Sequence, residues 1–316
     1  MTTTSLSFPS FAKINWYLQI LGKRADGYHE VLTVLQTVSL HDDLTFELRD
    51  DGEIVLSCDD PEIPLDASNL IVKAALELQS HLNCKLGADI KLIKRIPTRA
   101  GLGGASSNAA VTLMALNTLW DTRITAPDLI SISSGLGADV RFFLEGGRGI
   151  ATGIGADVSW IVDDAREPLI IVTPNARVST ANAYASLNAG SLTTSKSDPI
   201  LSSSLAERFS ADSRQWPLRN DFERVIFEIE PEIERAKMAL LEAGARGALL
   251  TGSGSSVFGI FDNETARDRA LNNLRREVGW RVFPCDTVTR GDFFTAMSSS
   301  WFRFIRSLKL QQDTGA

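Results

Sequence analysis

A glycine-rich stretch, "RIPTRAGLGGASSNAAVTLMALNTLW" (residues 95–120), constrains the fold of this 316-residue chain more than any other segment. Residues 87–96, "GADIKLIKRI", alternate apolar and polar side chains as a half-buried strand does. The apolar residues after the glycines recur at the spacing of one helix face: Ala109, Leu113, Leu116 and Trp120. We predict that Ser106 or Ser107 caps this helix. A strand that runs through glycines into a helix is typical of a phosphate site, because the first helical N–H groups point at the anion.

The glycines do not follow the spacing of the familiar nucleotide loops. A dinucleotide fingerprint needs Gly-x-Gly-x-x-Gly, a Walker loop needs Lys before Ser or Thr, and a protein-kinase loop lies between strands. Residues 101–107, "GLGGASS", fit none of these patterns, although Gly101 and Gly103 allow positive φ and close backbone approach. Taken alone, the stretch is also compatible with a turn that only permits tight packing. A second cluster, residues 252–256 ("GSGSS"), joins two apolar strands and by itself is typical of a hairpin.

Composition limits the class of protein. At ~150 residues per domain, the length predicts two domains. The net charge is −7, with 32 basic and 39 acidic residues scattered along the chain, which argues against nucleic acid as a partner. Three cysteines far apart give no disulfide or metal pattern. Without a run near the ~18 apolar residues of a membrane span, or a signal peptide, the sequence predicts a cytoplasmic protein.

Strand and helix patterns alternate without a regular β-α-β series, which predicts the α+β fold class. Residues 11–22 are rich in strand formers, and the apolar run at 140–144, "VRFFL", is expected to form a strand directly after Asp139. A helical pattern is interrupted before Pro231. The polar residues 188–214 are expected to form a surface excursion.

Three segments in order resemble the GHMP family of small-molecule kinases, which includes galactokinase, homoserine kinase and mevalonate kinase. They are "AKINWYLQILGKRADGYHE" (12–30), "KRIPTRAGLGGASSNAA" (94–110) and the glycine cluster at 252–256. The family pattern P-x-x-x-G-L-G-x-S-S matches six residues, with one extra residue before the serines: Pro97, Gly101, Leu102, Gly103, Ser106 and Ser107. The resemblance covers about residues 11–288.

The resemblance implies a two-domain GHMP kinase fold. Residues 1–165 would form an N-terminal, ATP-binding domain like the second domain of ribosomal protein S5, and residues 166–290 a C-terminal ferredoxin-like α/β sandwich. The tail at 291–316 has no assigned role. Its apolar residues recur at helical spacing, which favours packing on its own domain over a membrane-surface or partner helix: Trp301, Phe304, Ile305 and Leu308.

The resemblance also implies the catalytic site. ATP would lie on the glycine loop, formed by Pro97, Thr98, Arg99, Ala100, Gly101, Leu102, Gly103, Gly104, Ala105, Ser106 and Ser107. Mg²⁺, whose protein ligands stay unassigned, would bridge the outer phosphate oxygens and supply positive charge that the loop lacks. Asp139 would accept the proton of the attacking hydroxyl, and Lys13 would keep Asp139 ionised. Asp157 repeats the Gly-Ala-Asp-Val context and is an alternative base; Asp139 is preferred because an element edge would fix it.

Within the family, A-K-I-N followed by D-G-Y-H resembles the branch that phosphorylates the 2-hydroxyl of 4-diphosphocytidyl-2-C-methyl-D-erythritol in the methylerythritol phosphate route to isoprenoid precursors. The resemblance implies that Tyr28 and His29 hold the cytosine, with Tyr184 as a second aromatic. Asn15 would hydrogen-bond the substrate near the transferred phosphate.

This sequence departs from the pattern of that branch at two positions. Ala105 replaces a common third glycine, and Arg141 stands where proline usually follows Gly-Ala-Asp-Val. Two alternatives remain open: a kinase for another alcohol, such as homoserine or mevalonate, and a nucleotide or sugar sensor without turnover. The sequence leaves the oligomeric state undetermined.

Overall fold

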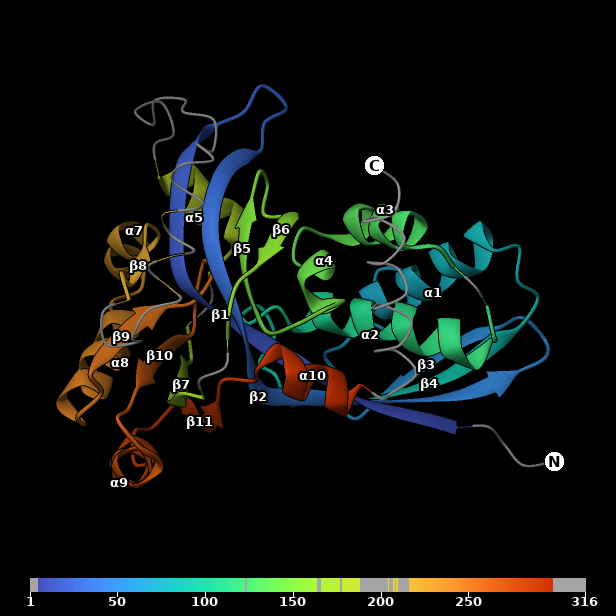
Figure 1. Cartoon of the computed structure of the whole chain (residues 1–316). Helices are drawn as coiled ribbons and strands as arrows, with labels where there is room; N and C mark the ends of the chain where they lie inside the picture. The colour runs from blue at the N-terminus through green and yellow to red at the C-terminus, as the bar shows by residue number, and fades with distance from the viewer. Residues whose placement is uncertain are drawn as a thin grey trace.

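The computed structural model describes residues 5–297, except 123, 164–165, 177, 188–203, 205–206, 208 and 210–215. Most of the predicted surface excursion at 188–214 and the predicted tail helix around Trp301 therefore lie outside the described residues. Figure 1 shows the described chain as two groups of helices joined by long strands that cross from one group to the other.

Among the described residues, seven strands form the larger sheet, in the order β3-β4-β2-β1-β8, with β5 paired to β2 and β6 paired to β5. They are β1 (Ser5–Lys23), β2 (His29–Arg49), β3 (Ile54–Cys58), β4 (Gly87–Ile93), β5 (Arg148–Thr152), β6 (Asp157–Trp160) and β8 (Arg219–Asn220). β1 and β2 are antiparallel strands of 19 and 21 residues, so the strand-rich start predicted from the sequence is confirmed.

Two irregularities in β1 lie on either side of Lys13 and Asn15. The register of β1 on β2 shifts between Phe11 and Ala12 and again between Asn15 and Tyr17. Bulges of this kind bend a strand, increase its twist and redirect side chains. The segment that carries Lys13 is therefore the part of β1 with the most irregular pairing.

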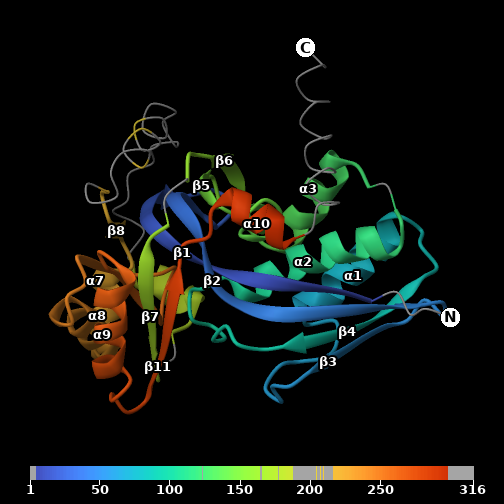
Figure 2. The same cartoon turned by 60° about the horizontal axis from the view of Figure 1, so that its bottom comes forward.

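Five described helices lie on one face of the larger sheet (Figures 1 and 2). They are α1 (Leu70–His81), α2 (Gly104–Leu119), α3 (Ala126–Leu136), α4 (Val140–Phe143) and α10 (Arg290–Ala296). α2 lies in the middle of this layer, and its four apolar residues predicted from the spacing are all buried: Ala109, Leu113, Leu116 and Trp120. Gly137 is the C-cap of α3.

The strand predicted at 140–144 is wrong, because Val140–Phe143 form the short helix α4. A short apolar run does not distinguish a buried strand from a buried helix. Val140 and Phe143, three residues apart, both pack into the helical layer as neighbours on one helix face.

A second sheet, of four described antiparallel strands, has the order β11-β7-β10-β9. Its strands are β7 (Pro168–Pro174), β9 (Gly247–Leu250), β10 (Val257–Ile260) and β11 (Trp280–Asp286). The helices of this part are α5 (Thr180–Ser186), α7 (Glu223–Ile229), α8 (Pro231–Glu242) and α9 (Glu264–Leu274). α8 and α9 pack on the sheet, as Figure 2 shows, and the helical break predicted before Pro231 separates α7 from α8.

Trp16 on β1 marks the core that both sheets share. Its side chain is fully buried, with ring centroids 4.9 Å from Trp216 and 5.2 Å from Phe258 on β10. Truncating a buried tryptophan typically costs about 3–5 kcal/mol of folding stability. This shared core fixes the loop before α2, on one sheet, relative to the turn between β9 and β10 on the other.

Candidate functional site

The glycine loop leads directly into α2. Gly103 is the N-cap of α2 at φ 70°, in the left-handed region, and has no side chain for capping. The N–H groups of Gly104, Ala105 and Ser106 in the first turn of this 16-residue helix have no partner within the helix and can bind an anion.

The predicted cap at Ser106 or Ser107 is wrong, since both residues lie inside α2. Ser107 is 1% exposed, and its hydroxyl accepts a hydrogen bond from Ser10 at 2.8 Å. Ala105 is exposed and helical, so the third glycine is not needed for backbone conformation at this position. Before the glycines, Pro97 and Ala100 are buried, whereas Thr98 and Arg99 are exposed.

Asp42 anchors both sides of this loop, although the sequence analysis did not select it. Its fully buried carboxylate accepts hydrogen bonds from the N–H groups of Arg95 (2.8 Å) and Ile96 (2.7 Å), just before the loop. It also accepts from Asn108 of α2 at 3.1 Å and pairs with Lys94 at 3.0 Å. One feature of the sequence could have identified it. Asp42 lies in phase with Leu40 and Leu44 in an alternating strand, so its carboxylate faces the core.

The second glycine cluster lies against the first. It is the turn of the hairpin formed by β9 and β10, as its sequence alone predicts. Thr251 donates its hydroxyl to the carbonyl of Gly101 at 3.2 Å, and Ser256 donates its N–H to that of Ala100 at 3.2 Å. A Cβ on Gly101 would lie 2.1 Å from the carbonyl oxygen of Thr251, so only glycine permits this approach.

Lys13 and Asn15 connect β1 to both glycine segments. The N–H of Lys13 donates to the carbonyl of Leu102 at 3.0 Å, and its ammonium donates to Asn15 Oδ1 at 2.7 Å. Asn15 Oδ1 also accepts the N–H of Gly252 at 2.9 Å, while Asn15 Nδ2 donates to Thr33 at 2.8 Å. Asn15 therefore holds the hairpin turn and orients the lysine at once.

Lys13 meets Asp139 at the start of α4. Lys13 Nζ lies 3.7 Å from Asp139 Oδ2, with side chains that are 5% and 34% exposed. Burial lowers the pKa of Lys13, and the nearby charge of Asp139 offsets part of that effect. Asp157, the alternative base, is exposed at the start of β6, and within the described chain no ion pair joins it to Lys13. The structure thus brings Asp139, rather than Asp157, to the lysine.

The aromatic residues form a separate end of the site. His29 stacks on Tyr184 of α5, with ring centroids 4.6 Å apart and an interplanar angle of 23°, while Tyr28 is 62% exposed. A third ring between two others needs about 7 Å, twice a van der Waals contact of ~3.5 Å. A base can therefore bind outside the His29–Tyr184 pair or after the rings separate, but not between them as they stand.

At the aromatic end, the surroundings shift the pKa values of His29 and Tyr184. Burial, and then the charge of Lys23, lower the pKa of His29, so its ring is neutral near pH 7. His29 Nε2 is buried and has no hydrogen-bond partner among the described residues. Burial, and then the charge of Asp139, raise the pKa of Tyr184 to about 12. The phenol of Tyr184 therefore lies within electrostatic range of the carboxylate at the other end.

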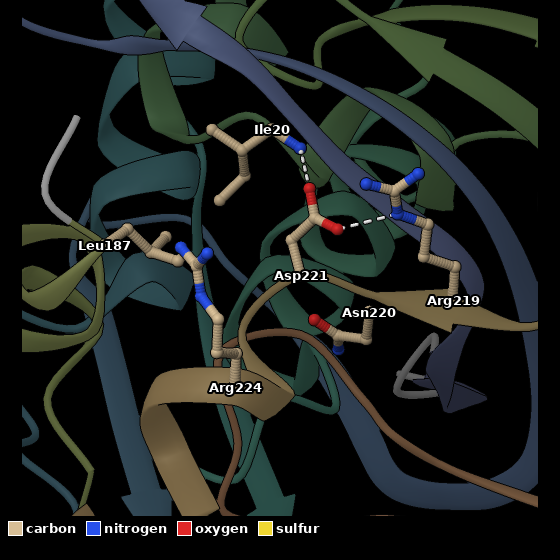
Figure 3. Close-up of a pocket in the computed structure, with 6 residues that line it drawn as sticks. All are labelled: Ile20, Leu187, Arg219, Asn220, Asp221 and Arg224. Carbon is tan, nitrogen blue, oxygen red and sulfur yellow. Dashed lines mark hydrogen bonds and ion pairs between the residues drawn. The ribbon is translucent and has the colours of Figure 1, made fainter. Parts of the chain in front are cut away.

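A cavity of about 250 Å³, shown in Figure 3, is lined by Ile20, Leu187, Arg219, Asn220, Asp221 and Arg224. Asp221 in its wall accepts the N–H of Ile20 at 2.9 Å and Nε of Arg219 at 2.7 Å. Asn220 donates to the carbonyls of Leu250 and Gly252, each at 2.8 Å, and so supports the hairpin turn from β8. Sequence reasoning missed Asn220 because nothing in its local pattern distinguishes it from a loop asparagine.

The described residues contain no group of three or more His, Cys, Asp or Glu side chains suited to a metal ion. In the same part of the chain, no helix is long and apolar enough to cross a membrane.

Two family models match the chain. "GHMP kinases N terminal domain" matches residues 69–147, and "GHMP kinases C terminal" matches residues 200–279. The first match contains the glycine loop and Asp139, and the second contains the hairpin turn at 252–256.

Similar proteins cover nearly the whole chain. The 4-diphosphocytidyl-2-C-methyl-D-erythritol kinase of Syntrophus aciditrophicus is 39% identical over 278 residues, which are 88% of this chain and 98% of that protein. The kinase of the same name from a Synechococcus strain is 41% identical over 276 residues, covering 84% and 88% of the two chains.

Among solved structures, a 4-(cytidine 5'-diphospho)-2C-methyl-D-erythritol kinase superposes with a TM-score of 0.75 at 30% identity, covering 89% of this chain and 99% of that one. The homoserine kinase of Cytophaga hutchinsonii, with a TM-score of 0.67 at 20% identity and coverage of 92% and 96%, shares the fold.

Proposed function

This chain belongs to the GHMP kinase family and, within it, to the 4-diphosphocytidyl-2-C-methyl-D-erythritol kinases, and we propose that Lys13 and Asp139 form its catalytic pair. It is a small-molecule phosphotransferase with an alcohol acceptor. The reaction transfers a phosphoryl group from ATP to the 2-hydroxyl of 4-diphosphocytidyl-2-C-methyl-D-erythritol, giving the 2-phosphate and ADP. It belongs to the methylerythritol phosphate route to isoprenoid precursors, and we expect it to proceed in the cytoplasm.

The donor is ATP, and in this proposal its phosphates lie on the loop from Pro97 to Ser107. Support comes from the first-turn N–H groups of α2, which have no partner within the helix and attract negative charge. The glycine positions add support, because a Cβ on Gly103 would lie 2.9 Å from the ring of Phe143, closer than a side chain can pack. Mg²⁺, when bound to these phosphates, would neutralise charge that develops on the transferred group.

Asp139 would accept the proton of the attacking 2-hydroxyl, a contribution typically worth about 10²- to 10⁴-fold in rate. The single observation that carries this assignment is the 3.7 Å approach of Lys13 to Asp139. Lys13 would stabilise the carboxylate before transfer and charge on the phosphoryl oxygens during it. Its bond to Asn15 leaves few orientations for the ammonium, so the pair is preorganised.

The acceptor side of the proposal assigns the cytosine to Tyr28, His29 and Tyr184. Support comes from the exposed ring of Tyr28 and from Nε2 of His29, which has no hydrogen-bond partner among the described residues. Stacking on an aromatic side chain contributes about 1–3 kcal/mol per base. Asn15 would act near the transferred phosphate through its amide.

ADP release tests this proposal directly. The purified protein is supplied with Mg-ATP and, in separate reactions, 4-diphosphocytidyl-methylerythritol, homoserine or mevalonate. Turnover of the cytidyl substrate alone is the expected result. Turnover of homoserine or mevalonate instead would overturn the acceptor assignment, and nucleotide binding without any turnover would identify a sensor.

A further inference from the structure

Helix α10, the last helix that the structure describes, packs behind the short helix α4. The chain turns after α4 at Gly146 and Gly147, whose φ angles are 60° and 75°. A Cβ on Gly146 would lie 2.4 Å from the ring of Phe293, and one on Gly147 would lie 2.6 Å from Cβ of Arg290. Both glycines are thus required by the approach of α10, which lies more than a hundred residues later in the sequence.

Four side chains, which we call the arginine clasp, join the two helices: Arg141, Glu145, Trp160 and Arg290. Arg141 of α4 donates to Glu145 Oε1 at 3.0 Å, and Arg290 of α10 pairs with Glu145 Oε2. Both guanidinium groups lie over the indole ring of Trp160, with carbons 4.8 Å and 4.7 Å from its centroid. The indole donates to the carbonyl of Gly146 at 3.0 Å, so it is fixed to the same turn.

The clasp brings two arginine cations to one buried carboxylate, that of Glu145. Burial lowers the pKa of Arg141, and burial together with the charge of Arg141 lowers that of Arg290 to about 10. Glu145 is 3% exposed; it accepts a hydrogen bond from Arg141 and forms an ion pair with Arg290. The face of an indole adds about 0.5–2 kcal/mol for each cation above it. Loss of either arginine would therefore remove one of the two cations that hold Glu145 and one of the two contacts with Trp160.

The opposite side of α4 faces the reaction. Phe143 touches the position that a Cβ on Gly103 would take, and Asp139 is the N-cap of the helix. A four-residue helix has too few internal hydrogen bonds to fix itself, so its orientation depends on what it packs against. Phe143 supports it on the loop side, and the arginine clasp supports it behind.

We propose that Arg141 and Arg290 are positioning residues for Asp139, and that α10 is therefore part of the catalytic architecture. This inference rests on the proposed role of Asp139. In this proposal, Arg141 ties the base-bearing helix α4 to α10 through Glu145 and Trp160. A misplacement near 1 Å at a reacting group costs up to about a hundredfold in rate, so a partial loss of support should cost less.

The test compares Arg290→Gln and Arg141→Gln with Arg166→Gln. Arg166 also binds α10, through Asp292 at 2.8 Å, but it is 67% exposed and does not reach α4. We expect each clasp variant to lower kcat about tenfold, with KM for ATP and for the acceptor changed less than about twofold. Arg290→Lys, which keeps a cation over Trp160, should recover kcat to within about threefold of wild type.

The double variant should lose little more kcat than either single one, because both act through one helix. All variants are assayed below their unfolding transitions, measured with urea. Unchanged kcat in both clasp variants, an equal loss in Arg166→Gln, or losses seen only in KM would overturn the proposal. Full activity of Asp139→Asn would instead remove the premise that Asp139 is the base, whatever the arginine variants do.

Discussion

The donor end and the acceptor end of the site are built in opposite ways. At the donor end, the loop between β4 and α2 is held by main-chain bonds, by the buried carboxylate of Asp42 and by the turn of the β9–β10 hairpin. At the acceptor end, Tyr28 is 62% exposed and His29 stacks on a protein ring rather than facing an open slot. If the proposed assignments hold, phosphate recognition is preorganised, whereas base recognition depends on exposed or rearranging rings.

The difference follows from what each end must recognise. Phosphate oxygens are met by N–H groups, whose direction is fixed once the backbone is fixed. A flat base binds by stacking on aromatic ring faces. Stacking tolerates lateral offset, and another side chain can occupy a ring face until a ligand displaces it. Substitutions at the donor end should therefore change both folding stability and the kinetic constants for ATP. Substitutions at the acceptor end should change only KM for the acceptor.

Asp42→Asn should give the largest effect on stability. It removes the charge opposite Lys94, which is largely buried, and breaking such a buried pair costs about 3 kcal/mol or more. Urea unfolding measures the loss. Asp43→Asn is the matched control, because Asp43 is 41% exposed and its pair with Arg95 should contribute at most about 1 kcal/mol. Equal losses in the two variants would mean that Asp42 is not a special anchor.

Gly101→Ala should lower kcat/KM for ATP about a hundredfold, since a Cβ would lie 2.1 Å from the carbonyl of Thr251 at φ +75°. Gly135→Ala is the control: a Cβ there meets nothing within 4 Å, and alanine should stabilise α3 by roughly 0.5–1 kcal/mol. Steady-state kinetics with ATP as the varied substrate distinguish the two. If Gly101→Ala kept wild-type kinetics, the close approach of the loops would not matter for donor binding.

Tyr28→Ala should raise KM for the cytidyl acceptor about tenfold, the equivalent of ~1.4 kcal/mol of stacking, and leave KM for ATP unchanged. The exposed ring contributes little to the fold, so unfolding should be unaffected. Varying each substrate in turn measures both constants. A rise in KM for ATP would contradict the separation of the two ends.

Tyr184 offers the mildest test, by titration. Its pKa in the fold, about 12, is above the ordinary 10.0, so the fold favours the neutral phenol. Its contribution to stability is complete below pH 10 and is lost as the pH rises toward about 12. Near-ultraviolet absorbance of phenolate should show a late component that Tyr184→Phe removes and Asp139→Asn moves to lower pH. A titration curve unchanged by Asp139→Asn would contradict the electrostatic link between the ends.

The sequence predicted much of the fold because periodicity reports which side of an element is buried. It identified the helix of α2, the break at Pro231 and the β9–β10 hairpin. It missed α4, because an apolar run as short as residues 140–144 has no periodicity that distinguishes a helix from a strand. It misplaced the cap of α2 because the N-cap is Gly103, whose role depends on its φ angle.

Within the site, the motifs pointed to Lys13 and Asp139, which the structure brings to 3.7 Å. They did not reveal Asp42 or Asn220, because these side chains act on distant backbone groups through contacts that no local pattern records. Arg141 appeared only as a departure from a pattern. Its partners Glu145 and Arg290 became visible through packing of segments far apart in the chain.

The central claim is that Asp139, held beside Lys13, is the base of the reaction. The most direct measurement compares kcat of Asp139→Asn with that of Asp157→Asn, since both aspartates follow Gly-Ala and precede Val. We predict a loss of about 10²- to 10⁴-fold for Asp139→Asn and a change of less than about twofold for Asp157→Asn. Near-normal turnover by Asp139→Asn, or a comparable loss in Asp157→Asn, would contradict the claim.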